Sequence, residues 1–364
     1  MSTTHRKTFP KILPQLHPDA KLARFTQPSV NQADPSDSVI AAEISRILVV
    51  GKVLFGKGDG EWKYLDEKKR SAYIGNIRRQ QDNLFPDLFA NMFRTDATYG
   101  IATPSYADVD SSITDQILLD LDACYEFTRL RGVAPLLFDR SWGNPYGLVF
   151  EGKVLSPDSP RHYYFAEKLV ALNDSSHKQK IVEIGGGYGG LAFMFNKMCP
   201  DIPYIIVDLF ETCILQYYFL RKAGIKVSLV LDPTEMLEPN TVAIVPTDIS
   251  DALLARYTDI GVIFNSRSFS EMSETTVKHY FSLIQNRLRP QYILHENSNF
   301  LLFPNSIRHL EILASEFPVD PVQYHLLQMN ISPFLGGGGR YREFLYERAK
   351  DALNNSPPIG VVVG

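Results

Sequence analysis

The stretch that decides the fold is Val182-Glu183-Ile184-Gly185-Gly186-Gly187-Tyr188-Gly189-Gly190. It continues the short apolar run at 180–185 and opens the segment 189–198, whose pattern predicts a helix. Glycine permits a tight turn and a close approach between backbone and ligand, and a helix N-terminus offers free N–H groups. The stretch therefore predicts a nucleotide-binding turn between a strand and a helix.

Two nucleotide-binding patterns fit these glycines. Gly185, Gly187 and Gly190 satisfy G-x-G-x-x-G, the dinucleotide fingerprint. Gly185, Gly187 and Gly189 satisfy G-x-G-x-G, with Glu183 two positions before it. We favour the second pattern because a carboxylate at the end of the strand can meet the cationic amino-acid end of S-adenosylmethionine. A pyrophosphate has no use for a negative charge there.

A second acidic residue strengthens this interpretation. Asp208 ends the predicted strand 203–209, where a carboxylate can accept hydrogen bonds from both ribose hydroxyls. Asp248 follows the third strand and is a candidate for the adenine amino group. The predicted cofactor-binding residues are Glu183, Gly185, Gly186, Gly187, Tyr188, Gly189, Asp208, Leu209, Asp248, Asn265 and Ser266.

Strands and helices alternate after residue 178. Strands are predicted at 180–185, 203–209, 242–246, 261–265 and 291–297, and helices at 189–198, 212–224, 273–288 and 306–317. The end of the chain predicts a hairpin of 322–330 and 341–349. This order predicts an α/β fold, namely a Rossmann-like, mostly parallel sheet with one terminal antiparallel strand.

The chain is expected to divide into four parts. Residues 1–37 carry five prolines and are predicted to be a flexible arm, and 351–364 a loose tail. Residues 38–155 are predicted to form a mainly helical domain, with a first helix capped by Ser36 or Asp37. Residues 156–350 would form the cofactor-binding domain, with a lead-in helix at 161–173.

Composition sets the broad class. The 364 residues are 45% hydrophobic and 21% charged with a net charge of −4, so a large core is expected and a dedicated nucleic-acid binder is not. Cys124, Cys199 and Cys213 fit neither a disulfide framework nor a metal site, so buried thiols are expected. No apolar run suits a signal peptide or membrane span, which favours a soluble cytoplasmic protein. A homo-oligomer is left open.

Three segments resemble the sugar O-methyltransferase family of bacteria, within the class I S-adenosylmethionine-dependent methyltransferases. They are VEIGGGYGGLA (182–192), VDLFET (207–212) with QYYFL behind it, and NSRSFSEM (265–272). The resemblance covers 160–300 well, although Phe210 stands where the family has proline. It implies a class I methyltransferase sheet and methyl transfer to a sugar hydroxyl, whether the sugar is free, nucleotide-linked or part of a glycan.

Methyl transfer from a sulfonium is an in-line displacement. The acceptor oxygen must lie about 3 Å from the methyl group, and a general base assists by removing its proton. The tips of the fourth and fifth strands offer His295, then Glu296, then Glu271 as candidate bases. His295 and Glu296 are adjacent, so in a strand they point opposite ways. The segment Asn265–Ser268 lacks an Asp pair, so we expect no metal.

The acceptor is expected to meet polar and aromatic side chains. The candidates are Tyr163, Tyr164, Arg267 and Ser268, together with Trp142, Tyr146 and His162. Other functions stay open at this point. The acceptor could be a phenolic or polyketide natural product, or the chain could be a non-catalytic cofactor-binding partner. An NAD-dependent oxidoreductase is disfavoured because Glu183 precedes the glycines, at a place where a pyrophosphate does not suit a carboxylate.

Overall fold

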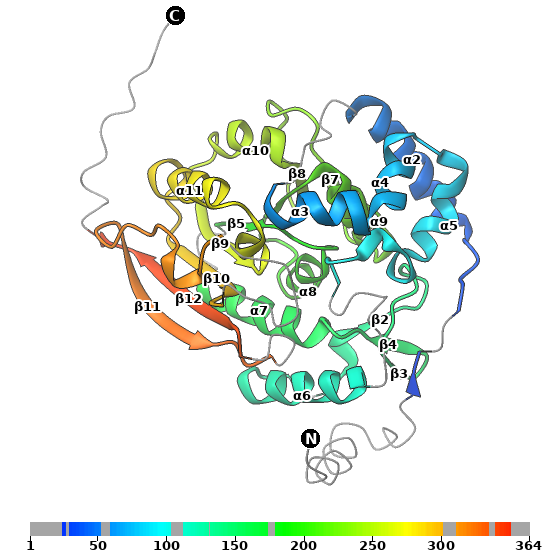
Figure 1. Ribbon diagram of the computed structural model, residues 1–364, viewed down its shortest axis with the longest axis horizontal. Helices are drawn as coiled ribbons and strands as arrows, with labels where there is room; N and C mark the ends of the chain where they lie inside the picture. The colour runs from blue at the N-terminus through cyan, green and yellow to red at the C-terminus, as the bar shows by residue number, and fades with distance from the viewer. Residues whose placement is uncertain are drawn as a thin grey trace, which may run out of the picture.

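The structure is a computed structural model that describes residues 24–26, 29–51, 59–102, 112–130, 132–173, 179–300, 311–334 and 339–350. Its centre is an eight-stranded sheet in the order β11-β12-β10-β9-β5-β6-β8-β7 (Figure 1). The strands are β5 (Lys180–Ile184), β6 (Tyr204–Asp208), β7 (Val227–Leu229), β8 (Val242–Pro246), β9 (Ile260–Ser266), β10 (Tyr292–Ser298), β11 (Tyr324–Ile331) and β12 (Tyr341–Arg348).

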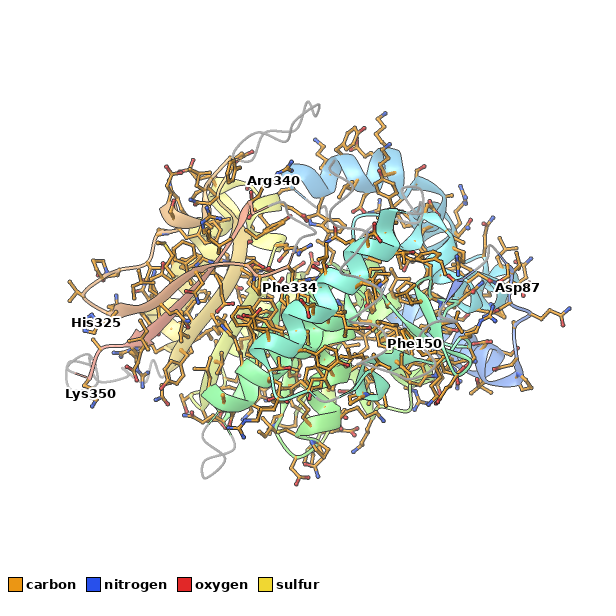
Figure 2. All side chains as sticks on the ribbon, turned by 90° about the horizontal axis from the view of Figure 1, so that it is seen from below. Asp87, Phe150, His325, Phe334, Arg340 and Lys350 are labelled. Carbon is orange, nitrogen blue, oxygen red and sulfur yellow. The ribbon has the colours of Figure 1, made fainter. Side chains whose placement is uncertain are left out.

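Strand direction confirms the predicted fold. Strands β7, β8, β6, β5, β9 and β10 pair in parallel, and β12 runs antiparallel to both β10 and β11. The reversed strand, β12, is second from the edge of the sheet. The edge strand is β11, which carries His325 (Figure 2). This is the Rossmann-like sheet of class I methyltransferases, with β7 as an additional edge strand that the sequence pattern did not predict.

Helices cover both faces of the sheet, as the alternation predicted. Helices α7 (Ser159–Leu172), α8 (Gly190–Met198) and α9 (Phe210–Lys222) pack on one face, which includes Ile206. Helices α10 (Thr247–Leu254) and α11 (Glu274–Leu283) pack on the other, which includes Ile205. Neighbouring residues of β6 thus enter different cores, as the period of a strand requires. Helix α10 was not predicted.

One predicted helix is wrong over the part that the structure describes. Residues 311–317 of the expected helix 306–317 contain only the short 3₁₀ turn Ala314–Glu316, and the rest of that helix lies outside the described residues. The predicted helix 273–288 ends earlier as an α-helix, and Ile284–Leu288 forms a π turn.

The described residues before 156, called the front section below, are mainly helical but also form a small sheet. Its helices are α2 (Pro35–Gly51), α3 (Gly60–Tyr64), α4 (Ser71–Arg78), α5 (Phe85–Ala90) and α6 (Ser112–Phe127). The unpredicted sheet has the order β1-β3-β4-β2, formed by Arg24–Phe25, Leu148–Phe150, Lys153–Leu155 and Leu137–Phe138. The domain boundary after residue 155 stays a prediction.

The front section shares its core with the large sheet. Phe93 contacts Tyr188 edge-on at 4.9 Å between ring centroids, and Phe89 stacks on Tyr218 of α9 at 5.0 Å. Phe334, which follows β11, packs against Tyr164 of α7 at 5.3 Å between ring centroids. Aromatic contacts of this kind add to ordinary apolar burial, so one continuous core joins both parts.

The described part of the N-terminal arm, residues 24–26 and 29–37, makes specific contacts, while its flexibility stays a prediction. Phe25 pairs with Leu148 in the small sheet. Asp34, rather than Ser36 or Asp37, caps α2, because its Oδ1 accepts the N–H groups of both. Residues 1–23, 27–28 and the predicted tail 351–364 lie outside the described residues.

The structure also shows the burial of the three cysteines and the character of the described helices. Cys124 and Cys213 are buried free thiols, and Cys199 is a half-buried one. Among the described helices, none combines the length and the apolar character that a membrane crossing needs.

Candidate functional site

A cavity of about 370 Å³ opens at the carboxyl ends of β5, β6 and β9. Ligands in open α/β sheets bind at this edge. The predicted site residues that line it are Glu183, Gly185, Gly186, Gly187, Tyr188, Asp208, Leu209, Ser266, Arg267, Ser268 and Glu271. The structure therefore brings the two acidic strand tips and the NSRSFSEM segment together around one space.

The glycine turn needs glycine for two separate reasons. Gly185 has φ +76°, and a Cβ there would lie 2.1 Å from the Ser268 hydroxyl. A Cβ on Gly186 would lie 2.4 Å from a methyl group of Ile206. The backbone therefore packs directly against Ile206 of β6 and against Ser268, which follows β9. Gly189 forms the N-cap of α8 and does not line the cavity.

Asp208 is held rigidly at the tip of β6. Its Oδ2 accepts the Gly186 N–H at 2.9 Å and the Gln216 amide at 2.7 Å, and its Oδ1 accepts the Leu209 N–H at 2.8 Å. Burial nevertheless raises the pKa of Asp208 to about 7. These bonds fix the carboxylate toward the cavity, in the position where ribose hydroxyls were expected.

Glu183 lies deeper, on the cavity side of β5. Only 3% of it is exposed, and its Oε2 accepts the Tyr204 hydroxyl at 2.9 Å. Burial raises the pKa of Glu183 to about 8, and the nearby Asp208 adds to the rise. A cation placed in the cavity would reverse this shift, because an opposite charge favours the ionised carboxylate.

Asn265 and Asp248 do not line the cavity. The Asn265 amide donates to the Ile184 carbonyl at 2.7 Å, and its oxygen accepts the Phe269 N–H at 3.2 Å. Asn265 therefore builds the corner after β9. Asp248 is exposed on α10, and its neighbour Thr247 lines the cavity instead.

Glu296 is also outside the cavity, although it touches residues that line it. Its Oε2 accepts the Ser266 hydroxyl at 2.8 Å and lies 3.6 Å from Arg161 Nη1 and 3.5 Å from Arg267 Nε. Burial alone would raise its pKa, but Arg267, Arg161 and the hydroxyls of Ser332 and Ser266 together lower it. Glu296 is thus an ionised partner of two arginines, and its role as a base stays a prediction that this placement does not favour.

His295 faces the opposite side of β10, as strand alternation requires. It is completely buried among rings, with Phe344 at 4.9 Å and Phe317 at 5.0 Å between centroids. Burial lowers its pKa to about 3. His295 does not line the cavity described above, so its role as the base stays a prediction that this placement does not favour.

Helix α7 presents a different set of residues from the one predicted. Arg161, His162 and Phe165 line the cavity, whereas Tyr163 and Tyr164 do not. Tyr163 donates to Glu167 at 2.9 Å, and Tyr164 donates to Glu343 at 2.9 Å. The i, i+4 spacing of Arg161 and Phe165 is the signal that would have indicated the cavity face.

His162 was proposed as a lining residue, and the structure confirms that position. Its Nδ1 lies 3.5 Å from the Tyr188 hydroxyl. Burial, together with the positive charges of Arg161 and Arg267, holds its pKa well below the ordinary value. The imidazole is therefore neutral at physiological pH, and these surroundings make it a weak base unless a negative charge lies nearby.

The front section closes the cavity from the outside. Asp59 and Trp62 line it at α3, and Gly100 and Ile101 line it from a later loop. Sequence reasoning missed these residues because no local pattern marks them. Trp142 and Tyr146, by contrast, do not line the cavity.

The donor set fits S-adenosylmethionine. One strand tip offers a carboxylate for a ribose, the next a carboxylate for an ammonium group, and the glycine turn leaves room between them. Within the described residues, no three His, Cys, Asp or Glu side chains are arranged to hold a metal ion.

Comparison with known proteins gives matches of fold only. No family model and no curated protein matches the sequence. Solved structures that match include a SAM-dependent methyltransferase from Aquifex aeolicus, at 14% identity and TM-score 0.34, covering 52% of this chain and 92% of that one. The methyltransferase domain of bacterial CtHen1-CN matches at 16% identity and TM-score 0.34, covering 50% and 97%.

A third match is the PH0226 protein from Pyrococcus horikoshii OT3, at 9% identity and TM-score 0.36, covering 52% of this chain and 92% of that one. Similarity at this level does not extend to function. The assignment of the fold therefore rests on the strand order and direction of the sheet itself.

Proposed function

We propose that this protein is an S-adenosylmethionine-dependent O-methyltransferase that acts on a sugar hydroxyl. The observation that carries the proposal is the convergence on one cavity of the glycine turn, Glu183 and Asp208 with a polar wall of Arg161 and His162. The sugar as acceptor comes from the sequence resemblance.

The cofactor side of the cavity would be formed by three groups. Asp208 would accept hydrogen bonds from the ribose hydroxyls, and Glu183 would face the ammonium group. The glycines Gly185–Gly187, which have no side chains, would leave room for the part of the cofactor between the ribose and the ammonium group. When bound, S-adenosylmethionine supplies an electrophilic methyl group.

The acceptor side would be formed by α7 and the corner after β9. We assign the general base to His162, because it lines the cavity and is neutral. Its task would be to take the hydroxyl proton as the oxygen attacks. Glu271 also lines the cavity and is the second candidate.

Calorimetry tests the cofactor class directly. We expect S-adenosylhomocysteine to bind in the micromolar range, as is common for ligands of enzymes, and NAD to give no heat. Heat with NAD and none with S-adenosylhomocysteine would overturn the proposal and favour the dinucleotide pattern.

Turnover tests the base. Radiolabelled S-adenosylmethionine would be incubated with a panel of sugars, sugar phosphates and nucleotide sugars to find an acceptor. His162→Ala should then lower the single-turnover rate about 10²–10⁴-fold and leave S-adenosylhomocysteine affinity unchanged. If Glu271→Ala alone shows this pattern, Glu271 is the base.

A further inference from the structure

The corner after β9 fixes Arg267 in an unusual backbone conformation. Arg267 has φ +70°, a left-handed value that costs free energy for a residue with a side chain. Its N–H donates to the Glu296 carbonyl at 2.6 Å, and the neighbouring Asn265 binds the Ile184 carbonyl. Hydrogen bonds on both sides thus hold the strained residue in place.

The side chain of Arg267 is equally well held. Its guanidinium lies over the Tyr341 ring, 4.4 Å from the centroid, and its Nε is 3.5 Å from Glu296. The side chain is 13% exposed and lines the cavity. A stacked guanidinium keeps its planar fork in one orientation, so less conformational entropy is lost when it binds an anion.

The guanidinium of Arg267 has hydrogen-bonding capacity left over in the part of the chain that the structure describes. Among the residues that the structure describes, none accepts a hydrogen bond from this guanidinium. Arg161 differs, because it donates to Ser266 at 2.6 Å and to Asp158 at 3.2 Å. A guanidinium carries five donors, so Arg267 has several left for a ligand.

The positive charges around His162 also favour a ligand that carries a negative charge. Arg161 and Arg267 both disfavour the imidazolium, which would hinder a base that must take a proton. A negative group on the ligand, placed against Arg267, would offset part of this repulsion. An anion bound against Arg267 would therefore also favour proton uptake by His162.

We propose that the acceptor carries an oxyanion, either a carboxylate or a phosphate, that Arg267 binds through its guanidinium fork. The acceptor class is then sugar acids and sugar phosphates rather than neutral sugars. This inference rests on the proposed function and specifies the acceptor of that same cavity.

The experiment titrates protein saturated with S-adenosylhomocysteine. The probes are methyl glucuronide, glucose 6-phosphate and neutral methyl glucoside. Ligand-observed NMR measures the dissociation constant of each. A charge-assisted bond contributes about 1.5–3 kcal/mol, so at least one anionic probe should bind roughly 10- to 100-fold more tightly than the neutral one. The carboxylate and phosphate arms distinguish the two anions.

Three variants make the test specific. Arg267→Gln should remove the preference for anionic probes, and Arg267→Lys should keep an intermediate preference because it retains charge without the fork. Arg287→Gln is the matched control, since Arg287 is exposed and lies outside the cavity. Circular dichroism confirms that each variant is folded.

Two results would overturn the inference while leaving the proposed function intact. One is equal binding of neutral and anionic sugars by the wild-type protein. The other is an Arg267→Gln variant that loses S-adenosylhomocysteine affinity but still binds 5′-methylthioadenosine, which lacks the carboxylate; Arg267 would then hold the cofactor. Failure of S-adenosylhomocysteine to bind the wild-type protein would instead overturn the proposed function.

Discussion

Asp208 shows how one carboxylate can be both fixed and available. Two backbone N–H groups and the Gln216 amide hold it, yet it still lines the cavity. Asp248 offers a natural comparison, because the sequence predicted both as cofactor ligands and the structure exposes Asp248 on α10. The two aspartates should therefore respond differently to the same substitution.

We expect Asp208→Ala to weaken S-adenosylhomocysteine binding by about 2–3 kcal/mol, the size of a lost pair of charge-assisted hydrogen bonds. Asp248→Ala should leave the dissociation constant unchanged. Calorimetry measures both. An unaltered constant in Asp208→Ala would show that this carboxylate does not hold the ribose.

Glu183 gives a prediction about pH. Its pKa is about 8 in the folded protein against an ordinary 4.5, so the protonated form is favoured on folding. It therefore contributes stability that is fully present below about pH 4.5 and is lost as pH rises through about 8. Ligand binding has the opposite dependence, because the cationic group of the cofactor requires the ionised carboxylate.

The affinity for S-adenosylhomocysteine should consequently rise between pH 6 and 8, by up to about tenfold per unit, with release of protons. Calorimetry in buffers of different ionisation enthalpy measures that release. Glu183→Gln should lower the affinity at pH 8 and reduce the pH dependence, leaving only the part due to Asp208. A wild-type affinity that does not change with pH would contradict this account.

At the scale of one element, strand β10 separates two roles that the sequence placed side by side. Glu296 faces α7 and anchors Arg161 and Arg267, while His295 faces an aromatic cluster on the other side. Neither ring nitrogen of His295 has a hydrogen-bond partner among the described residues. The imidazole therefore behaves as a buried aromatic ring.

We expect His295→Phe to fold and to retain S-adenosylhomocysteine affinity, because phenylalanine removes two unsatisfied nitrogens from an aromatic site. Since the pKa of His295 is lowered to about 3, its contribution to stability is present above pH 6.5 and is lost as pH falls toward 3. Urea unfolding at pH 7 and pH 4.5 should show a smaller acid loss in the variant. An equal loss in both proteins would contradict this assignment.

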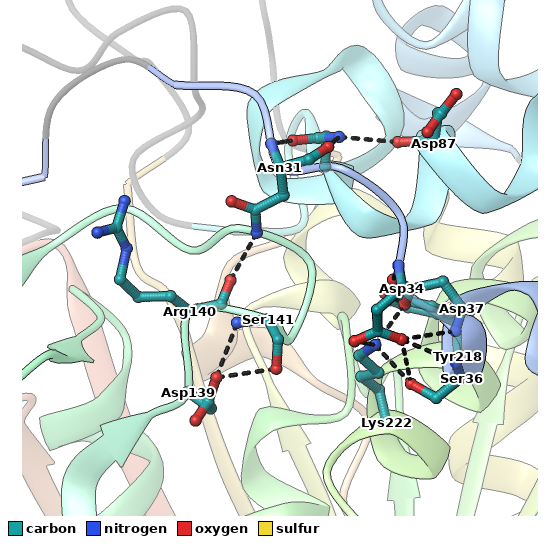
Figure 3. Close-up of polar contacts among 11 residues, drawn as sticks. Asn31, Asp34, Ser36, Asp37, Asp87, Asp139, Arg140, Ser141, Tyr218 and Lys222 are labelled. Carbon is teal, nitrogen blue, oxygen red and sulfur yellow. Dashed lines mark hydrogen bonds and ion pairs between the residues drawn. The ribbon is translucent and has the colours of Figure 1, made fainter.

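A second element-scale feature joins the start of α2 to the end of α9. Lys222 Nζ lies 2.6 Å from Asp37 and 2.7 Å from Asp34, and the Tyr218 hydroxyl donates to Asp37 at 2.7 Å (Figure 3). The side chains of Lys222 and Asp37 are only 4% and 3% exposed. Removing one partner would leave a buried charge unpaired.

Lys222→Ala should therefore destabilise the protein by about 3–5 kcal/mol. Lys226→Ala is the matched control, because Lys226 and its partner Glu238 are exposed, and such pairs contribute about 0–1 kcal/mol. Chemical denaturation compares the two variants. Equal stability losses would show that the buried pair has no special role.

At the scale of the whole molecule, the front section and the large sheet share one hydrophobic core and should unfold together. Trp62 lines the cavity, and Trp142 packs edge-on against Phe193 of α8 at 5.3 Å. Both tryptophans belong to the front section, so their fluorescence reports on that part, whereas far-ultraviolet circular dichroism reports on the whole chain.

We expect the two urea transitions to coincide, as they do for one cooperative unit. A chain of residues 156–350 alone should be insoluble, because it would expose the apolar surface of α8 and α9 that the front section covers. A fluorescence transition at clearly lower urea than the dichroism transition would show two independent units.

Local signals explain what the sequence predicted well. Gly185 and Gly187 have positive φ values, which favour glycine locally, and Glu183 and Asp208 follow from their places near strand ends. The parallel sheet followed from the alternation of short apolar strands with helices. Each of these features depends on residues within about one turn or one strand, so it can be read along the chain.

Tertiary structure decided the rest of the site. The contacts of Arg161 on α7 with Glu296 and Ser266 join segments more than 100 residues apart. Asp59, Trp62 and Ile101 reach the cavity only because the front section packs over the sheet. Such positions carry no local period or turn signal, because packing between distant segments fixes them rather than the conformation of their own neighbours.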